Sequence, residues 1–133
     1  MVTASDVLPL RTEQDVVLAR QAVRRHAQAL GFSIVDQTKI VTAASELARN
    51  TLIHGKGGIL KWELLSEDVR KGLRLTFEDE GPGIPDLGLA LTDGWTSGAG
   101  LGMGLSGARR LVSEFDIRSE PGRGTTVVVA RWT

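Results

Sequence analysis

The spacing of the apolar residues changes midway along this chain, and that change limits the folds it can adopt. Before residue 55, apolar residues recur every three or four positions, which places their side chains on one face of a helix. After residue 59 they alternate with polar residues, the period of a strand with one buried face. The helical positions are Val16, Ala19, Ala22, Val23, Ala27 and Leu30, then Ile40, Val41, Ala44, Leu47, Ala48 and Thr51; the alternating ones are Leu60, Trp62, Leu64, Leu73, Leu75 and Phe77. Two amphipathic helices are therefore expected ahead of a β-hairpin.

Local signals set the expected boundaries. Thr12 suits the start of a helix, because Glu13 and Asp15 then lie near the positive end of the helix dipole. We expect a strand over Asp6 to Arg11, a helix from Thr12 to Gly31, a helix from about Val35 to His54 that closes at Gly55, a charged hairpin turn over Glu67 to Gly72, a loop over Gly81 to Gly100, a helix over Leu105 to Glu114, a strand over Asp116 to Glu120, a turn over Pro121 to Gly124, and a final strand with Val127 and Val129. Helices that cover one face of a mixed sheet make a two-layer α/β sandwich, an α+β arrangement.

Length and charge narrow the classes of function. With 133 residues the chain fits a single domain over residues 1–133. Sixteen basic and sixteen acidic residues cancel, which disfavours nucleic acid or an anionic membrane as the main partner and favours a protein or a small molecule. The sequence has no cysteine, which excludes thiol catalysis and is compatible with a reducing compartment, so we expect a soluble cytoplasmic protein without a membrane span.

Two glycine-rich segments point to an anion site. They are Asp79-Glu80-Gly81-Pro82-Gly83 and Gly98-Ala99-Gly100-Leu101-Gly102-Met103-Gly104. Glycine lets backbone N–H groups approach and converge on a phosphate. The second run leads into the helical pattern that starts at Leu105, which places an anion site at a helix N-terminus. By itself, such a run could equally be a flexible loop.

The second helix carries Glu46, Asn50 and His54, each four residues from the next, so the three project along one stripe. A carboxylate can act as a general base, and an amide oxygen is a neutral ligand suited to Mg²⁺. Taken alone, this pattern is more often a solvated helix face. His54 could also be there only because a histidine suits the negative end of a helix.

Two further residues complete the candidate site. Asp79 ends an apolar strand, where its carboxylate could accept a hydrogen bond from an exocyclic amine. Thr125 follows Gly124 at the entry to the last strand, where its hydroxyl could join Asp79 in recognising a base. The alternative for the Asp79 segment is an ordinary turn at the end of a strand. Taken together with the helix stripe and the glycine runs, these residues read as an ATP site.

In this order, the motifs Glu46-x-x-x-Asn50, Asp79-x-Gly81-x-Gly83, Gly100-x-Gly102-x-Gly104 and Gly124-Thr125 resemble those of the GHKL ATPase and kinase superfamily. The segment Ser45-Glu46-Leu47-Ala48-Arg49-Asn50 is similar to that of the anti-sigma-factor serine/threonine kinases, and within them of the switch kinases of the stressosome. The resemblance extends over nearly the whole chain, up to Trp132. It implies the Bergerat fold, a mixed, mostly antiparallel sheet covered on one face by about three helices.

The resemblance also implies roles for residues. The residue matching Asn50 binds the Mg²⁺ that bridges the ATP phosphates, and the one matching Glu46 activates the attacking hydroxyl. Asp79 would hold the adenine amine, with Thr125 assisting through a water, and Gly81 and Gly83 would make room for the base. Residues around the second glycine run would wrap the phosphates, and about Asp86 to Ala99 would form a lid over the nucleotide. The expected phosphate-binding residues are Gly98, Gly100, Leu101, Gly102, Met103, Gly104 and Leu105.

Family kinases of this type phosphorylate a serine or threonine of a STAS-domain protein, and the phosphate governs an exchange of partners. Released switch kinase then activates a PP2C-type phosphatase. A weak homodimer is a further partner arrangement that we consider. Three alternatives stay open: an anti-sigma factor that binds a sigma subunit directly, an ATP-gated binding module without transferase activity, and a detached histidine-kinase catalytic domain. The pattern assigns no role to Arg49, Lys56, Arg109, Arg110 or Trp95.

Overall fold

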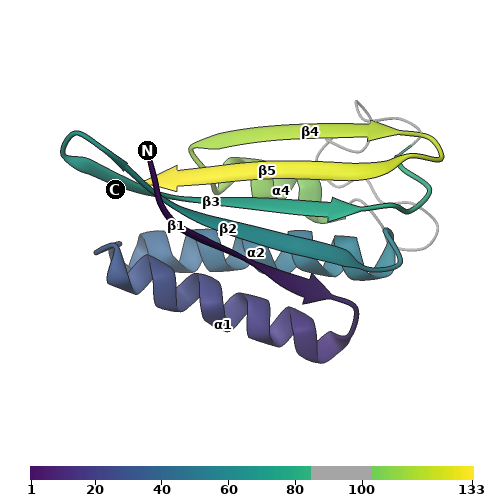
Figure 1. Cartoon of the computed structure of the whole chain (residues 1–133), viewed down its shortest axis with the longest axis horizontal. Helices are drawn as coiled ribbons and strands as arrows, with labels where there is room; N and C mark the ends of the chain where they lie inside the picture. Colours follow the sequence, from purple (N-terminus) through teal and green to yellow (C-terminus); the bar gives the residue numbers. More distant parts are fainter. Residues whose placement is uncertain (85–102) are drawn as a thin grey trace.

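The computed structural model describes residues 1–84 and 103–133. The predicted order of strands and helices is confirmed within these ranges (Figure 1). The elements are β1 (Val2–Leu10), α1 (Glu13–Ala29), α2 (Ile34–Ile53), β2 (Gly58–Glu67), β3 (Arg70–Asp79), α4 (Met103–Arg110), β4 (Glu114–Glu120) and β5 (Gly124–Trp132). Among the described residues, no helix is both long and apolar enough to cross a membrane.

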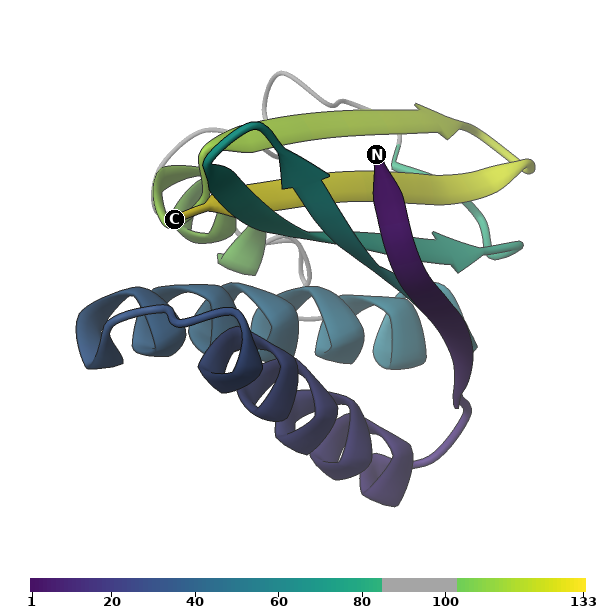
Figure 2. The same ribbon diagram turned by 60° about the vertical axis from the view of Figure 1, so that its left-hand side comes forward.

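The five described strands form one sheet in the order β1-β2-β3-β5-β4. The sequence predicted a mixed, mostly antiparallel sheet, and all four pairings between the described strands are antiparallel. The three described helices lie on one face of the sheet, as Figure 2 shows, and no described helix covers the other face, called the open face below. This is the expected two-layer α+β sandwich.

The core lies between the sheet and the helices. Alternate residues of β2, β3 and β5 face the helices, among them Leu60, Leu75 and Val129, which are fully buried. They meet helix residues such as Val23 and Ile40 in one continuous cluster. Burial of this apolar surface holds the two layers together.

Both long helices begin at a side-chain cap. The Thr12 hydroxyl accepts the N–H of Asp15, and the Asp15 carboxylate accepts the N–H of Thr12 in return, a reciprocal capping box. In α2, the hydroxyl of Ser33 accepts the N–H of Asp36. These caps fix where α1 and α2 start.

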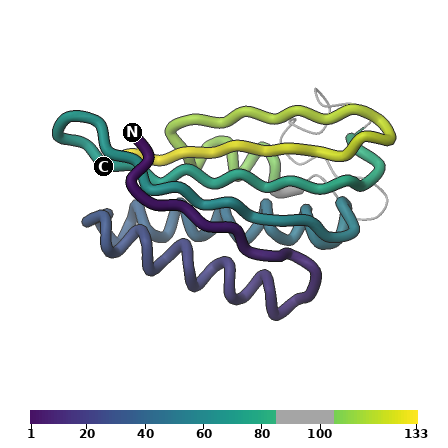
Figure 3. The backbone as a smooth tube through the Cα atoms, in the orientation of Figure 1, coloured from purple at the N-terminus to yellow at the C-terminus, as the bar shows by residue number. Residues whose placement is uncertain are grey.

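Several predicted boundaries were wrong by a few residues, among them the start of β4, which is Glu114 and not Asp116. β1 begins at Val2, not Asp6, because it pairs along nearly its whole length with β2. The hairpin turn shrinks to Asp68 and Val69, since the charged flanks of the predicted turn pair across the two strands, Glu67 opposite Arg70. The turn projects at the end of the molecule that holds the chain termini (Figure 3).

The third described helix, α4, ends at Arg110, not at the predicted Glu114. Leu111 and Val112 still pack against the core, which explains why the apolar pattern seemed to continue. The N–H of Leu111 turns to the carbonyl of Ala108, and the N–H of Ser113 donates to Ala130 of β5. The chain therefore leaves the helix and enters β4 at Glu114.

Candidate functional site

Three elements end or begin together at one end of the molecule, away from the chain termini (Figure 1). They are the C-terminal end of α2, the last residue of β3 and the first residues of β5. Asp79 of β3 pairs directly with Thr125 of β5, and Thr125 pairs with Ser119 of β4. Asp79, Thr125 and Ser119 therefore form one row across the helix-facing side of the sheet.

Asp79 is held in a partly buried position. Its Oδ1 accepts the backbone N–H of Gly81 at 2.9 Å. Burial raises the pKa of the Asp79 carboxyl, while the N–H groups of Gly81 and Thr125 and the charge of His54 act in the opposite direction. The carboxylate is thus an acceptor in a partly desolvated place, as recognition of an amine requires.

Glycines make the loops around Asp79 pack closely. A Cβ on Gly55 would overlap the side chain of Asp79, and a Cβ on Gly81 would meet the backbone of Gly55 at 2.8 Å. Gly83 and Gly124 have positive φ, and their missing side chains face the backbone carbonyls of Glu120 and Asp79. The space next to Gly81 and Gly83 is therefore filled by backbone, so these glycines have a packing role.

The sequence indicates Gly55 only as the end of a helix, and no motif predicts its contact with Asp79. The same is true of Ser119, which belongs to no motif. Its hydroxyl lies 2.9 Å from that of Thr125 and accepts the N–H of Ile84 at 2.7 Å. Both contacts depend on how distant strands and loops pair.

Asn50 lies on α2 and is partly buried. Its Nδ2 is buried and has no hydrogen-bond partner among the described residues. Buried polar atoms are normally paired, so this amide fits a site that awaits a ligand. The nitrogen is a donor that could meet a phosphate oxygen, while the oxygen of the same amide is the atom that could bind the Mg²⁺ of a nucleotide, because Mg²⁺ is commonly held by one or two protein oxygens together with substrate phosphates.

Glu46 is exposed one turn before Asn50 on the same helix. Within the described residues there is no cluster of three or more acidic or histidine side chains that could hold a metal ion. Arg49 instead pairs with Glu13 of α1, at 3.7 Å on an exposed surface.

His54, at the end of α2, contacts the glycine loop. Its Nε2 lies 3.0 Å from the carbonyl oxygen of Gly83; because a carbonyl can only accept, Nε2 carries the proton in this bond. This contact gives His54 a role beyond the helix dipole, since it joins the helix that carries Asn50 to the loop that follows Asp79.

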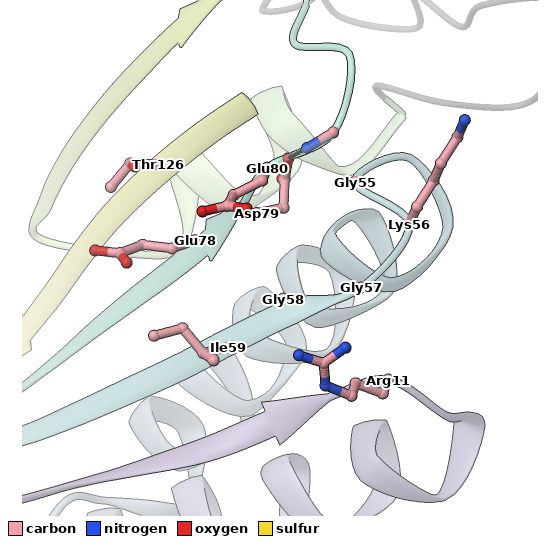
Figure 4. A pocket seen from close by; sticks show the side chains of 11 residues that line it. Arg11, Gly55, Lys56, Gly57, Gly58, Ile59, Glu78, Asp79, Glu80 and Thr126 are labelled. Carbon is pink, nitrogen blue, oxygen red and sulfur yellow. Dashed lines mark hydrogen bonds between the residues drawn. The ribbon is translucent and has the colours of Figure 1, made fainter. Parts of the chain in front are cut away.

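A cavity of about 640 Å³ lies at the same end of the sheet (Figure 4). Asp79 and Gly81 line it, but Glu46, Asn50 and Thr125 do not. Its other walls include Ile59, Glu78 and Thr126, which pair with one another on the open face of the sheet. This cavity is therefore not the place where the predicted site residues meet.

Several predicted residues lie outside the described ranges. They are Gly98, Gly100, Leu101 and Gly102, the expected lid over Asp86 to Ala99, and Trp95. Met103 and Gly104, the last two residues of the glycine run, are the first two of α4, so this helix begins two residues before the predicted Leu105. Leu105 is 2% exposed and belongs to the core, so any contact that it makes to a phosphate would come from its backbone.

A family model described as histidine kinase-, DNA gyrase B-, and HSP90-like ATPase matches residues 21–132. This chain therefore belongs to that family of ATPases, the GHKL group. Within it, the chain is 44% identical over 123 residues to the serine/threonine-protein kinase RsbT of Bacillus subtilis (strain 168), covering 92% of both chains. It is also 31% identical over 129 residues to an anti-sigma F factor of Clostridium novyi (strain NT), covering 92% of this chain and 89% of that one.

A solved structure supports the fold. The crystal structure of the RsbU and RsbW domains of a Mycobacterium tuberculosis protein superposes with a TM-score of 0.65 at 24% identity. The match covers 97% of this chain but 32% of the larger one. At this identity the likeness shows a shared fold alone, which agrees with the predicted α+β sandwich.

Proposed function

We propose that this protein is an ATP-dependent kinase that transfers a phosphoryl group to a serine or threonine hydroxyl of a partner protein. The observation that carries the proposal is the buried amide nitrogen of Asn50, which has no partner among the described residues, at the same end of the fold as the half-buried carboxylate of Asp79. Glu46 adds a base that nucleotide binding alone does not need. The 44% identity to a serine/threonine-protein kinase supports the same activity.

In this proposal each residue has one task. Asp79 accepts a hydrogen bond from the adenine amine, Thr125 assists through a water, and Asn50 holds the Mg²⁺. Glu46 takes the proton of the attacking hydroxyl, whose oxygen bonds to the γ-phosphorus as the bond to the leaving ADP oxygen breaks. Bound Mg²⁺ would neutralise phosphate charge. Positioning and charge neutralisation account for most of catalysis in phosphoryl transfer, so this small set of groups suffices.

The substrate that we propose is a STAS-domain protein, and the purpose of the reaction is an exchange of partners in the cytoplasm. Phosphorylation would release the kinase, which would then activate a PP2C-type phosphatase. The second candidate output is direct binding of a sigma subunit, favoured by the 31% identity to an anti-sigma F factor. Both outputs use the same ATP site, because fold and site do not fix the partner.

The proposal is tested by phosphotransfer. The protein is incubated with Mg²⁺, γ-labelled ATP and each STAS-domain protein of its own organism, and the label on protein hydroxyls is measured. We expect one STAS protein to be labelled and Glu46→Gln to slow labelling at least 100-fold, the lower range for a general base. ATP affinity should stay within about twofold, since Glu46 does not hold the nucleotide.

The matched control is Glu67→Gln, which removes an exposed carboxylate beside the hairpin turn at the opposite end of the molecule and should leave the rate unchanged. ATP binding without transfer to any STAS protein would contradict kinase activity and favour a nucleotide-gated binding module. Equal loss of rate in both variants would contradict the role of Glu46.

A further inference from the structure

Ser119 of β4 connects three parts of the candidate site through one hydroxyl. Its Oγ accepts the backbone N–H of Ile84 at 2.7 Å and lies 3.2 Å from the carbonyl oxygen of Gly124 and 2.9 Å from the hydroxyl oxygen of Thr125. Ile84 follows the glycine loop after β3. Ser119 therefore joins that loop to the first two residues of β5.

The Ser119 and Thr125 hydroxyls have one hydrogen each, and this limits where the Thr125 hydrogen can point. Ser119 has a single hydrogen and already accepts from Ile84. Ser119 can direct this hydrogen at the Gly124 carbonyl, 3.2 Å away, or at the Thr125 hydroxyl, 2.9 Å away. If it donates to Gly124, Thr125 must donate to Ser119 and offers only lone pairs to a ligand. If Ser119 donates to Thr125, the Thr125 hydrogen is free to point at a ligand. In either arrangement, Ser119 decides what Thr125 can present.

The surrounding contacts hold the same loop from both sides. On one side, the turn between β4 and β5 packs against it, since the N–H of Gly122 donates to Pro82 at 2.8 Å. Oγ of Ser119 is 3.2 Å from where a Cβ of Gly83 would lie. On the other side, His54 donates to the Gly83 carbonyl. Because Gly122 and His54 also hold this loop, loss of the Ser119 hydroxyl should remove the bond to Thr125 while the loop stays in place.

The row formed by Asp79, Thr125 and Ser119 suggests what the orientation of the Thr125 hydroxyl is for. Asp79, Thr125 and Ser119 are direct neighbours on one face, so Thr125 stands between the carboxylate of Asp79 and the hydroxyl of Ser119. A ligand group beside Asp79 also lies near the Thr125 hydroxyl. An amine and an unprotonated ring nitrogen on one edge of a purine need an acceptor and a donor side by side. Asp79 and Thr125 offer that pair when Ser119 donates to Thr125.

We propose that Ser119 is a positioning residue that sets the base preference of the nucleotide site by orienting the hydroxyl of Thr125. The inference rests on the proposed function, because it assumes that Asp79 and Thr125 meet the base. Adenine presents an amine and an unprotonated ring nitrogen on this edge, whereas hypoxanthine presents an oxygen and a protonated nitrogen. A fixed Thr125 hydroxyl distinguishes these two patterns, and a freely rotating one does so less well.

The test compares dissociation constants for Mg·ATP and Mg·ITP by titration calorimetry in the wild type and in Ser119→Ala. We expect the preference, the ratio of the ITP constant to the ATP constant, to fall about fivefold in Ser119→Ala, within the range of one neutral hydrogen bond. A purely structural role would weaken both nucleotides equally and leave the ratio unchanged, which would overturn the inference. Arg118→Ala, a neighbour on β4 with an exposed side chain, is the matched control and should keep the ratio.

A double-mutant cycle tests whether Ser119 acts through Thr125. In Thr125→Val the preference should already be reduced, and adding Ser119→Ala should reduce it no further. A second full reduction would overturn the inference. Ser119→Thr, which keeps a hydroxyl, should retain the preference. If Ser119→Ala does not fold, Ser119→Cys, which nearly preserves shape but is a weak hydrogen-bonding group, should show the same loss.

The outcomes separate this inference from the proposed function. If the wild type binds neither nucleotide, the proposed function fails and this inference fails with it. If the wild type binds ATP with a clear preference and the preference is unchanged in Ser119→Ala, this inference alone fails.

Discussion

At the scale of single residues, the partly buried carboxylate of Asp79 lowers the stability of the fold, yet the proposed function needs it for binding. Burial raises the pKa of its carboxyl, and two backbone N–H groups and His54 offset only part of that effect. The charged form, which the proposed function needs, is therefore less favourable in the folded protein than in the unfolded chain. A charge that costs stability is a frequent mark of a functional site.

This balance predicts how stability depends on pH. Because the pKa of Asp79 is raised on folding, the native state binds more protons than the unfolded state between the ordinary carboxyl pKa, about 4, and the raised value. The contribution of Asp79 to the free energy of unfolding should thus fall as pH rises through that window. Asp79→Asn removes this contribution.

We therefore expect the unfolding free energy of Asp79→Asn to rise relative to that of the wild type as the pH increases from about 4 to neutral. Urea denaturation at several pH values measures it. ATP binding should be weakened in the same variant. Exposed Asp116→Asn is the control and should show no such trend. A difference that is constant with pH, or that moves in the other direction, would contradict the burial argument.

At the scale of elements, the α2–β2 connection and the loop after β3 cross with almost no space between them. Gly55 lies directly over the Asp79 side chain and against Gly81. Strand and helix ends are thereby fixed relative to one another before any ligand binds. Such preorganisation lowers the cost of ordering the site on binding.

This contact predicts a specific sensitivity. Gly55→Ala should destabilise the protein by about 1–3 kcal/mol, the usual cost of overpacking, and should weaken ATP binding because Asp79 must move. Gly107→Ala is the matched control, since a Cβ there meets nothing within 4 Å and α4 should gain up to about 1 kcal/mol. Thermal or urea denaturation separates the two. Equal stability of both variants would refute the close crossing.

The elements also show what the sequence could predict. Periodicity was enough for α1, α2 and the β2–β3 hairpin, because their apolar positions are set by local burial. It failed at the end of α4, where Leu111 and Val112 are partly buried against the core without being helical. The motif residues Asn50, Asp79 and Thr125 could be predicted as candidates because each lies at or near the end of a recognisable element. Gly55 and Ser119 were missed, since their importance comes from pairing with distant residues.

At the scale of the whole molecule, the order of strands creates the site. β5 is last in the chain, yet it inserts between β3 and β4, which brings Thr125 beside Asp79. Arg131, near the end of β5, binds Asp36 of α2 at 2.6 Å and the carbonyl of Leu111 at 2.9 Å. The last strand thus ties the start of α2 to the segment that follows α4. No local pattern predicts such long-range pairing.

We propose that Mg·ATP binds where α2, β3 and β5 meet on the helix-facing side of the sheet. Nuclear magnetic resonance of the ¹⁵N-labelled protein during titration with Mg·ATP tests it most directly. We predict the largest shifts at the side-chain amide of Asn50 and the backbone amides of Gly81 and Thr125, with none at Val69 in the hairpin turn. Shifts confined to Ile59 and Thr126, on the open face, or no shifts at all, would contradict the account.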